Sequence, residues 1–116
     1  MERSAIRIDP TIRYQIFTLS VDPDGISRRI RVEIRYLNEP QLWYISMFDA
    51  STGEAFFRYV PIIASYEFPN DLLKPFRHKH IGSLYCVPVV SEPQTTDPGL
   101  DNLGEFELIW GDTDDT

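Results

Sequence analysis

Alternation of charged and apolar residues between Arg28 and Tyr36 constrains this chain more than any other feature of its sequence. In RRIRVEIRY the apolar set is Ile30, Val32, Ile34 and Tyr36, and the polar set between them is Arg29, Arg31, Glu33 and Arg35. A period of two residues places successive side chains on opposite faces of a β-strand, whereas a helix repeats every 3.6 residues. This segment therefore predicts a strand with one buried and one solvated face.

Five further segments predict strands, because they are rich in aromatic and β-branched residues and are bounded by turn residues. They span residues 14–21, 42–49, 54–63, 82–90 and 105–112. Only NDLLKPF at 70–76 predicts a helical turn, which Asn70 or Asp71 would cap and Pro75 would end. We therefore expect an all-β fold, a small β-barrel or β-sandwich of about six antiparallel strands with at most one short helical turn.

The links between these strands carry specific turn residues. DPDG at 22–25 places Pro23 at the first corner of a turn and Gly25 where a positive φ is needed. DASTG at 49–53 ends in a glycine and predicts a hairpin. Pro61 predicts that the strand it belongs to lies at a sheet edge or contains a bulge.

The length of 116 residues and the hydrophobic content of 42% suit one globular domain. We expect an N-terminal arm at 1–13, a single β-domain at 14–112 and a flexible acidic C-terminus at 113–116. The sequence has no run of about 18 apolar residues that would predict a membrane-spanning helix. Its first ten residues lack the apolar stretch of a signal peptide, so we expect a protein that stays in the cytoplasm where it is made or enters an assembly there.

Charge is distributed unevenly along the chain. Residues 1–90 hold eleven basic and ten acidic side chains, a net charge of +1, whereas residues 91–116 hold eight acidic and no basic side chains, a net charge of −8. An acidic end repels nucleic acid, and it serves either solubility or contact with a basic surface. Arg29 and Arg31 are candidates to receive such an acidic segment from a neighbouring subunit. Binding of single-stranded nucleic acid would need aromatic residues on the arginine-bearing face, and Tyr36 falls on the other face.

No pattern in the sequence is typical of catalysis or metal binding. His78 and His80 would share a strand face, but no third ligand lies nearby. Glu105 and Glu107 fit the solvated face of the last strand better than a catalytic carboxylate pair. Cys86 lies among apolar residues and predicts a core position. We expect no enzymatic activity, no metal and no cofactor.

Four segments from residue 42 onward resemble a family of small phage tail proteins, the baseplate plug proteins of contractile-tailed phages, including cyanophages. The segments are, in order, LWYISMFDASTGE, VPIIASYEFPNDLLKPF, GSLYCV and DPGLDNLGEFELIW. The positions that match the family's motifs are Trp43, Tyr44, Gly53, Leu72, Leu73, Gly82, Leu84, Asp101, Leu103 and Gly104. The basic RHKH segment at 77–80 and the N-terminal arm depart from the family pattern.

The resemblance implies a structural protein of the virion tail baseplate, near the tube or hub. It further implies several copies in a symmetric assembly that dock onto tube, hub and wedge proteins, with no nucleic-acid or membrane partner. An alternative is a β-domain that binds a carbohydrate or another small ligand. That alternative would expose aromatic side chains in a flat row, drawn from Trp43, Tyr44, Tyr59 and Trp110.

Three parts of the chain are candidate contact elements. In the arm, Ile6, Ile8 and Ile12 are spaced well enough to join a neighbour's sheet, since an unpaired strand edge invites strand addition. The arginine pair Arg29 and Arg31 is the second element. The acidic loop is the third, with the candidate interface residues Asp97 and Asp101. Gly104 after Leu103 predicts a turn of positive φ that closes this loop.

Overall fold

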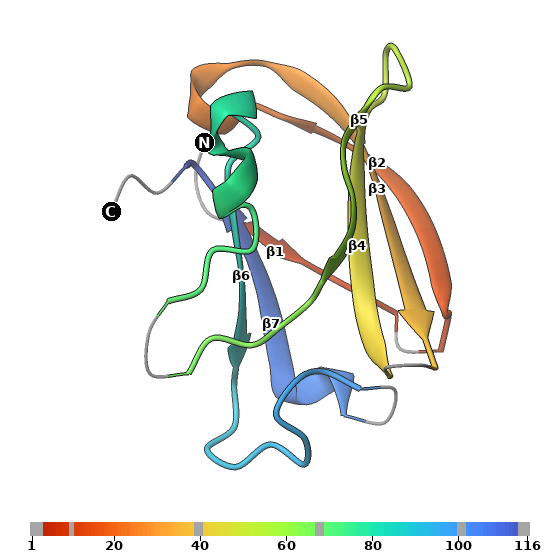
Figure 1. Ribbon diagram of the computed structural model, residues 1–116, viewed down its shortest axis with the longest axis vertical. Coiled ribbons are helices and arrows are strands. Elements are labelled where there is room, and N and C mark those ends of the chain that lie inside the picture. The colour runs from red at the N-terminus through yellow and green to blue at the C-terminus, as the bar shows by residue number, and fades with distance from the viewer. Residues whose placement is uncertain (1–3, 10, 39–40, 67–68, 100–101, 114–116) are drawn as a thin grey trace.

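The computed structural model describes residues 4–9, 11–38, 41–66, 69–99 and 102–113, which form a β-sandwich (Figure 1). One sheet has three strands in the order β1-β7-β6, and the other has four strands in the order β2-β3-β4-β5. All named strand pairs are antiparallel. The all-β prediction is confirmed, and of the two expected architectures the described residues form the sandwich.

Six of the seven strands lie where the sequence predicted strands. The bounds are β1 (Ser4–Ile6), β2 (Tyr14–Val21), β3 (Arg28–Leu37), β4 (Leu42–Asp49), β5 (Ala55–Pro61), β6 (Ser83–Pro88) and β7 (Phe106–Gly111). The additional strand, β1, falls inside the predicted arm at 1–13. Three residues are too few to show a period of two, which is why the sequence did not reveal it.

The described residues form three short 3-10 helices, where the sequence predicted at most one helical turn: η1 (Pro23–Gly25), η2 (Lys74–Lys79) and η3 (Leu103–Glu105). The turn predicted at 70–76 lies later in the chain, as η2. Pro75 lies in the first turn of η2, which begins at Lys74, rather than ending it, because a missing N–H and a fixed φ are tolerated in a first turn. Gly104 lies within η3 and does not have the positive φ predicted for it, unlike Gly25 and Gly53.

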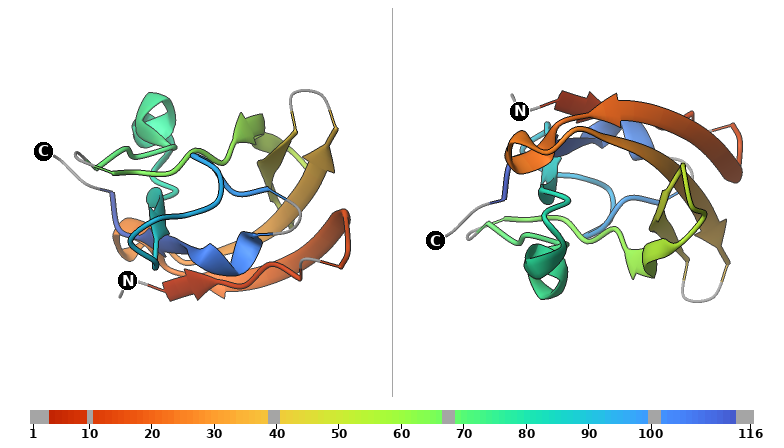
Figure 2. Two further views of the ribbon diagram at one scale, coloured as in Figure 1. Left: turned by 90° about the horizontal axis from the view of Figure 1, so that it is seen from below. Right: turned by 90° about the horizontal axis from the view of Figure 1, so that it is seen from above.

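The core lies between the two sheets. Ile30, Val32 and Ile34 of β3 are fully buried in it, as the alternation predicted. Trp43 and Trp110 are also buried, and each indole N–H donates to a backbone carbonyl oxygen inside the protein. These bonds remove the cost of burying an unpaired donor. Seen along the long axis, the four-stranded sheet curves around one side of the molecule (Figure 2).

Candidate interaction surfaces

The solvated side of the four-stranded sheet gathers arginine and aromatic side chains, and we call it the arginine face. Residues that alternate with the core positions of β2, β3 and β4 point to this side, and β5 adds two more. The arginine face consists of Tyr14, Ile16, Thr18, Ser20, Arg29, Arg31, Glu33, Arg35, Tyr44, Ser46, Phe48, Arg58 and Tyr59. Its four arginines and one glutamate give a local net charge of +3, in a chain whose net charge is −7.

Strand register decides which of these side chains meet. Arg31 is paired across to Phe48, and its guanidinium carbon lies 4.4 Å from the centroid of that ring. Arg35 is paired across to Tyr14 on the other side, with its guanidinium carbon 4.5 Å from the ring centroid. Arg58 approaches the Phe48 ring at 5.5 Å. Stacking of this kind holds a guanidinium group flat while its N–H edge stays available for hydrogen bonds.

Glu33 lies among these arginines and is partly neutralised by them. Its carboxylate accepts a hydrogen bond of 2.5 Å from the Tyr14 hydroxyl and lies 3.3 Å from the Arg31 guanidinium. The bond to Glu33 raises the pKa of the Tyr14 phenol, because the phenol is needed as the donor. Any acidic ligand on the arginine face would therefore compete with Glu33 for Arg31.

A hollow of about 240 Å³ opens in the arginine face between β2 and β5. A bulge shapes its β5 side, since the β4–β5 register shifts between Ile45 and Met47. Tyr59 there has a left-handed φ of 54°, and its backbone N–H donates to the Ser46 hydroxyl at 2.9 Å. This bond accounts for a buried serine in the sheet. β5 is an edge strand of its sheet and contains this bulge, which confirms the edge position or bulge that Pro61 predicted.

The arginine face corrects one step of the sequence interpretation. Tyr36 packs edge-on against Trp43, at 5.4 Å between centroids, and lies away from the arginines as expected. Aromatic side chains from β2, β4 and β5 nevertheless share the arginine face, and Tyr14 and Tyr59 are 41% and 53% exposed. The expectation that the arginine-bearing face lacks aromatic side chains is therefore wrong, and it no longer argues against nucleic-acid binding. The sequence analysis named Tyr44 and Tyr59 as candidate exposed aromatics but missed Tyr14 and Arg58 as surface residues. The antiparallel register of 14–21 on 28–37 would have brought Tyr14 beside Arg35.

The predicted arm lies against the sandwich. β1 pairs with residues 108–110 of β7, and Ile6 is buried in the core. Ile8 packs against the core more loosely. Ile12 is 46% exposed, so it is the member of the isoleucine trio that solvent reaches most. The side chain of Gln15 donates to the carbonyl oxygens of Asp9 and Ile12, which ties the arm to the start of β2.

The acidic loop is held by its own polar side chains. The Asp97 carboxylate accepts a hydrogen bond of 2.9 Å from the backbone N–H of Ala64. The buried Asn102 accepts from the backbone N–H of Gly99 and donates to the Thr95 hydroxyl. Asp101, the second candidate of this loop, lies outside the described residues. Asp97 thus has a structural partner within the chain, whatever else it contacts.

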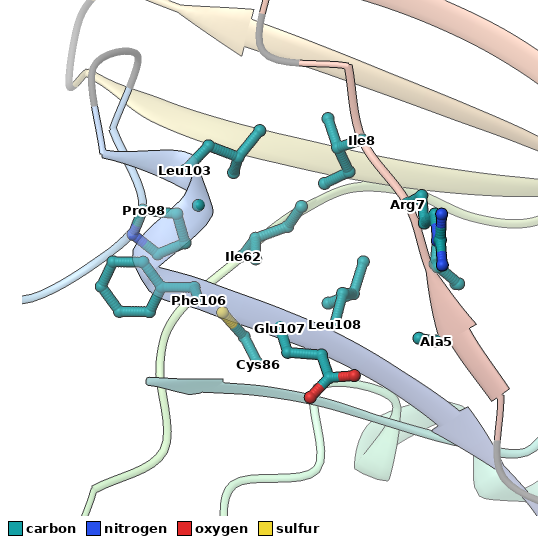
Figure 3. A pocket seen from close by; sticks show the side chains of 12 residues that line it. Ala5, Arg7, Ile8, Ile62, Cys86, Pro98, Leu103, Phe106, Glu107 and Leu108 are labelled. Carbon is teal, nitrogen blue, oxygen red and sulfur yellow. The ribbon is translucent and has the colours of Figure 1, made fainter. Parts of the chain in front are cut away.

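A second hollow, of about 360 Å³, lies between the arm and the end of the acidic loop. Figure 3 shows Ile8, Ile62 and Leu103 gathered around it from the arm, the segment after β5 and η3. The Cys86 thiol is on its wall, and burial raises the pKa of this thiol to about 12. A thiol of that pKa is protonated and unreactive near neutral pH. The lining is otherwise mainly apolar, with charged side chains only from Arg7 and Glu107.

The side chains that would support other functions are placed elsewhere. His80 Nδ1 lies 3.3 Å from the Asp24 carboxylate, and no group of three or more possible metal ligands exists among the described residues. Glu107 is exposed on β7, whereas Glu105 accepts from the backbone N–H of Gln94. Of the aromatics named for the carbohydrate-binding alternative, Trp43 and Trp110 are buried, which opposes it, whereas Tyr44 and Tyr59 lie on the arginine face. None of the described helices is long and apolar enough to cross a membrane.

Comparison with known families shows which family this chain belongs to. The family described as cyanophage baseplate Pam3 plug gp18 matches residues 3–114. The chain belongs to this baseplate plug family. No curated protein matches the chain significantly.

The match to the baseplate plug family covers every strand from β1 to β7, and it confirms the resemblance inferred from the four sequence segments. Several motif residues of that resemblance are core residues here: Trp43, Leu72, Leu73, Gly82 and Leu84 are all buried. These motifs therefore mark packing and turn positions. The baseplate plug family is a family of phage structural proteins, so its surface is where function must be sought.

Proposed function

We propose that this baseplate plug protein is a structural component of a contractile phage tail baseplate, positioned near the tube or hub. It acts by docking onto tube, hub and wedge proteins, in several copies and without catalysis, nucleic acid or membrane. The observation that carries the proposal is the family match over residues 3–114. The protein is made in the host cytoplasm and ends in the virion tail.

Docking uses shape and charge on the elements identified above. Arg29 and Arg31 present positive charge on the arginine face to an acidic surface of a neighbour. Ile12 continues into the exposed Tyr14 and Ile16 of β2, an apolar strip at the edge of the four-stranded sheet. Strand edges of this kind pair readily with other chains.

The remaining candidates take more restricted roles in the proposal. Ile6 and Ile8 are packed inward, so β1 contributes to docking through its backbone, as an edge strand of the three-stranded sheet. Asp97 and Asp101 belong to the acidic loop, which faces a basic surface of a neighbour. Because Asp97 also holds Ala64, its replacement would alter the loop as well as the contact.

Light scattering of the purified chain, alone and mixed with purified tube, hub and wedge proteins, tests the proposal. We expect a defined complex only in a mixture with a baseplate partner. The variant Arg29→Glu/Arg31→Glu is expected to weaken that complex, whereas Lys74→Glu, a charge reversal on the exposed η2, is the matched control. A chain that joins none of the proteins contradicts the docking function. A complex that is indifferent to the arginine reversal contradicts the role of Arg29 and Arg31 alone.

A further inference from the structure

We propose that the outer edge of β2 is the docking site for β2 of a second copy of this chain, so that two four-stranded sheets join into one continuous antiparallel sheet. The inference deepens the proposed docking function, on which it rests, by naming the occupant of one surface. Both halves of the contact lie within residues 12–22, all of which the structure describes. The contact is isologous, because each copy uses the same surface and a two-fold axis relates the two copies.

β2 is an edge strand without the features that usually protect such an edge. Among the described strands it pairs only with β3, in a register that runs without interruption from Tyr14 to Val21 (Figure 1). Its sequence, YQIFTLSV, holds no charged residue, proline or glycine. Soluble proteins usually block exposed edges with charges, prolines, bulges or very short strands. A long edge that lacks all four favours the addition of another strand.

The hydrogen bonds of the sheet fix which backbone groups of β2 face outward. The Tyr36 N–H donates to the carbonyl oxygen of Arg13 at 2.8 Å, so the odd-numbered residues along this strand bond to β3. In an antiparallel ladder these bonds alternate along the strand. The residues whose N–H and C=O groups point away from β3 are therefore the even-numbered ones, Tyr14, Ile16, Thr18 and Ser20. Their side chains are exposed as well.

These outward groups fit a second copy of β2 in one antiparallel register. All four outward residues find a partner when Tyr14 lies opposite Ser20 of the second copy and Ile16 lies opposite Thr18. None of these residues is charged, so identical strands meet without repulsion. The two-fold axis then passes beside Phe17, which faces Phe17 of the second copy in a non-hydrogen-bonded pair, where side chains are closest. Aromatic pairs across strands stabilise a sheet.

The inner side of β2 has apolar surface that this contact would cover. Phe17, Leu19 and Val21 pack against the core and are only partly buried, whereas Ile30 and Ile34 of the neighbouring β3 are fully buried. The difference arises because β2 has a neighbouring strand on one side only. A second sheet added at the edge removes part of this apolar surface from water, which favours association.

Charges at the two ends of β2 favour an antiparallel second copy. Arg13 precedes the strand and Asp22 follows it, and both are exposed. In the antiparallel register Arg13 lies opposite Val21 of the second copy, next to its Asp22, and symmetry repeats this attraction at the other end. A parallel arrangement would bring like charges together. Within one chain the two charges are nine residues apart along an extended strand, about 30 Å, so they attract each other only between copies.

The arginine faces of the two copies do not oppose the contact. Their charged residues on β3 lie one strand inward from the edge in each copy. The two β3 strands would therefore be three strand spacings apart, about 14 Å. The Debye length at physiological ionic strength is about 8 Å, so repulsion between the two arginine rows is largely screened.

Sedimentation of the full chain at about 0.15 M salt tests the inference by a charge swap. We expect the unmodified chain to form dimers as its concentration rises. Arg13→Glu and Asp22→Arg each replace two attractive pairs by two repulsive ones, and each is expected to weaken dimerisation about tenfold. The double variant Arg13→Glu/Asp22→Arg restores opposite charges and is expected to return to within about threefold of the unmodified chain. Lys74→Glu and Glu54→Arg are the matched controls, because they change the net charge equally at exposed sites outside β2.

Disulfide trapping tests the register. Phe17→Cys places two thiols opposite each other across the two-fold axis, at a Cα separation of about 4.5 Å that suits a disulfide. Leu19→Cys is the matched control on the same side of β2, but its two thiols would lie four residues apart along the strands, about 13 Å. We expect a covalent dimer, reversible by dithiothreitol, only with Phe17→Cys. The native Cys86 is buried and does not compete.

Circular dichroism checks that every variant is folded, and the charge swap decides alone if a cysteine variant is not. The inference fails if the double charge variant dimerises no better than the single variants, or if both cysteine variants are trapped equally. A chain that stays monomeric alone but joins the baseplate mixture removes this inference and leaves the proposed function intact. Loss of that mixed complex in Ile16→Lys would then assign the β2 edge to a different baseplate protein. A chain that neither dimerises nor joins any mixture contradicts both.

Discussion

The indole nitrogen of Trp110 donates a hydrogen bond to the carbonyl oxygen of Ile81 at 2.8 Å, inside the core. This bond joins the end of β7 to the segment that leads into β6. Gly82, the next residue, lies directly against the same indole. A Cβ atom added to Gly82 would lie 2.8 Å from the indole nitrogen and 2.2 Å from the carbonyl oxygen of Gly111. With a φ of +94°, this position requires glycine for two separate reasons.

Replacement of Gly82 by alanine is therefore expected to destabilise the protein by about 2–5 kcal/mol, through backbone strain and overpacking together. Chemical denaturation followed by tryptophan fluorescence measures the loss. Gly53→Ala is the control, because Gly53 also has a positive φ but an added Cβ would meet no atom within 4 Å. We expect a loss of about 1–2 kcal/mol there. Equal losses at the two sites would refute the role of the Trp110 contact.

Asp71 is expected to stabilise the link between η2 and β6. Its carboxylate accepts hydrogen bonds from the backbone N–H groups of Leu73 and Leu84, at 2.9 and 3.0 Å, and from the Ser83 hydroxyl at 2.7 Å. Asp71→Ala would leave two buried N–H groups without this partner and is expected to cost about 2–4 kcal/mol of unfolding free energy.

Asp71→Asn keeps one carbonyl acceptor and is expected to cost less than Asp71→Ala in the same urea denaturation. Glu54→Ala, at an exposed carboxylate of the β4–β5 hairpin, is the control for loss of charge. Similar stabilities for Asp71→Ala and Glu54→Ala would show that these hydrogen bonds contribute little.

Asp24 is expected to make stability fall in acid. Partial burial acts to raise the pKa of the Asp24 carboxyl, but the hydrogen bonds from Thr113 and the contact with His80 outweigh it and lower the pKa below the ordinary value of 3.8. The folded state binds a proton on the Asp24 carboxylate less tightly than the unfolded state does. The ionised carboxylate therefore stabilises the fold above about pH 4, and this stabilisation is lost as the pH falls through the lowered pKa.

The variant Asp24→Asn isolates this contribution, since asparagine tolerates the left-handed φ of 55° at position 24. We expect the stability difference between the unmodified chain and Asp24→Asn to be largest above pH 4 and to shrink on acidification. Urea denaturation from pH 6 down to about pH 2.5 measures it. A difference that is constant over this range would contradict the lowered pKa.

Cys86 is expected to be inert in the folded protein. Burial raises the pKa of its thiol from 9.0 to about 12, so the thiolate population at pH 8 is roughly a thousandfold lower than in the unfolded chain. Alkylation by iodoacetamide is therefore expected to follow unfolding in a denaturant series. Ser51→Cys places a thiol in the exposed β4–β5 turn and is expected to react in both states. Rapid alkylation of Cys86 in the native protein would refute its burial.

Local sequence patterns identified the strands because their causes are local. The bounds of β2 agree with the predicted 14–21, and the buried isoleucines of β3 are those that the alternation selected. Pairing across strands depends instead on contacts between segments that are distant in the sequence. β1 is recognisable only through its ladder with β7. Pro75 lies in the first turn of η2, shortly after Asp71 and Leu72, which are hydrogen-bonded to β6.

The candidate interface was only partly accessible to sequence reasoning. Arg29 and Arg31 lie on a solvated face, as their spacing predicted, and their role in docking stays a prediction. The stacking of Arg31 on Phe48 and of Arg35 on Tyr14 depends on strand register, which no single segment encodes. The burial of Ile6 in the chain's own core also depends on register, because β1 must pair with β7 for it. The apolar side chain alone suited a neighbour's sheet equally well.

The sequence by itself determined the all-β class, most strand positions and the family, because a period of two, turn residues and motif order are all written along one chain. Only the tertiary structure decided which residues share a surface. Side chains 11 to 45 positions apart, such as Tyr14, Arg31, Phe48 and Tyr59, meet on the arginine face because two sheets must bury their apolar sides against each other. That burial fixes the register, and the register places the charges that a partner would meet.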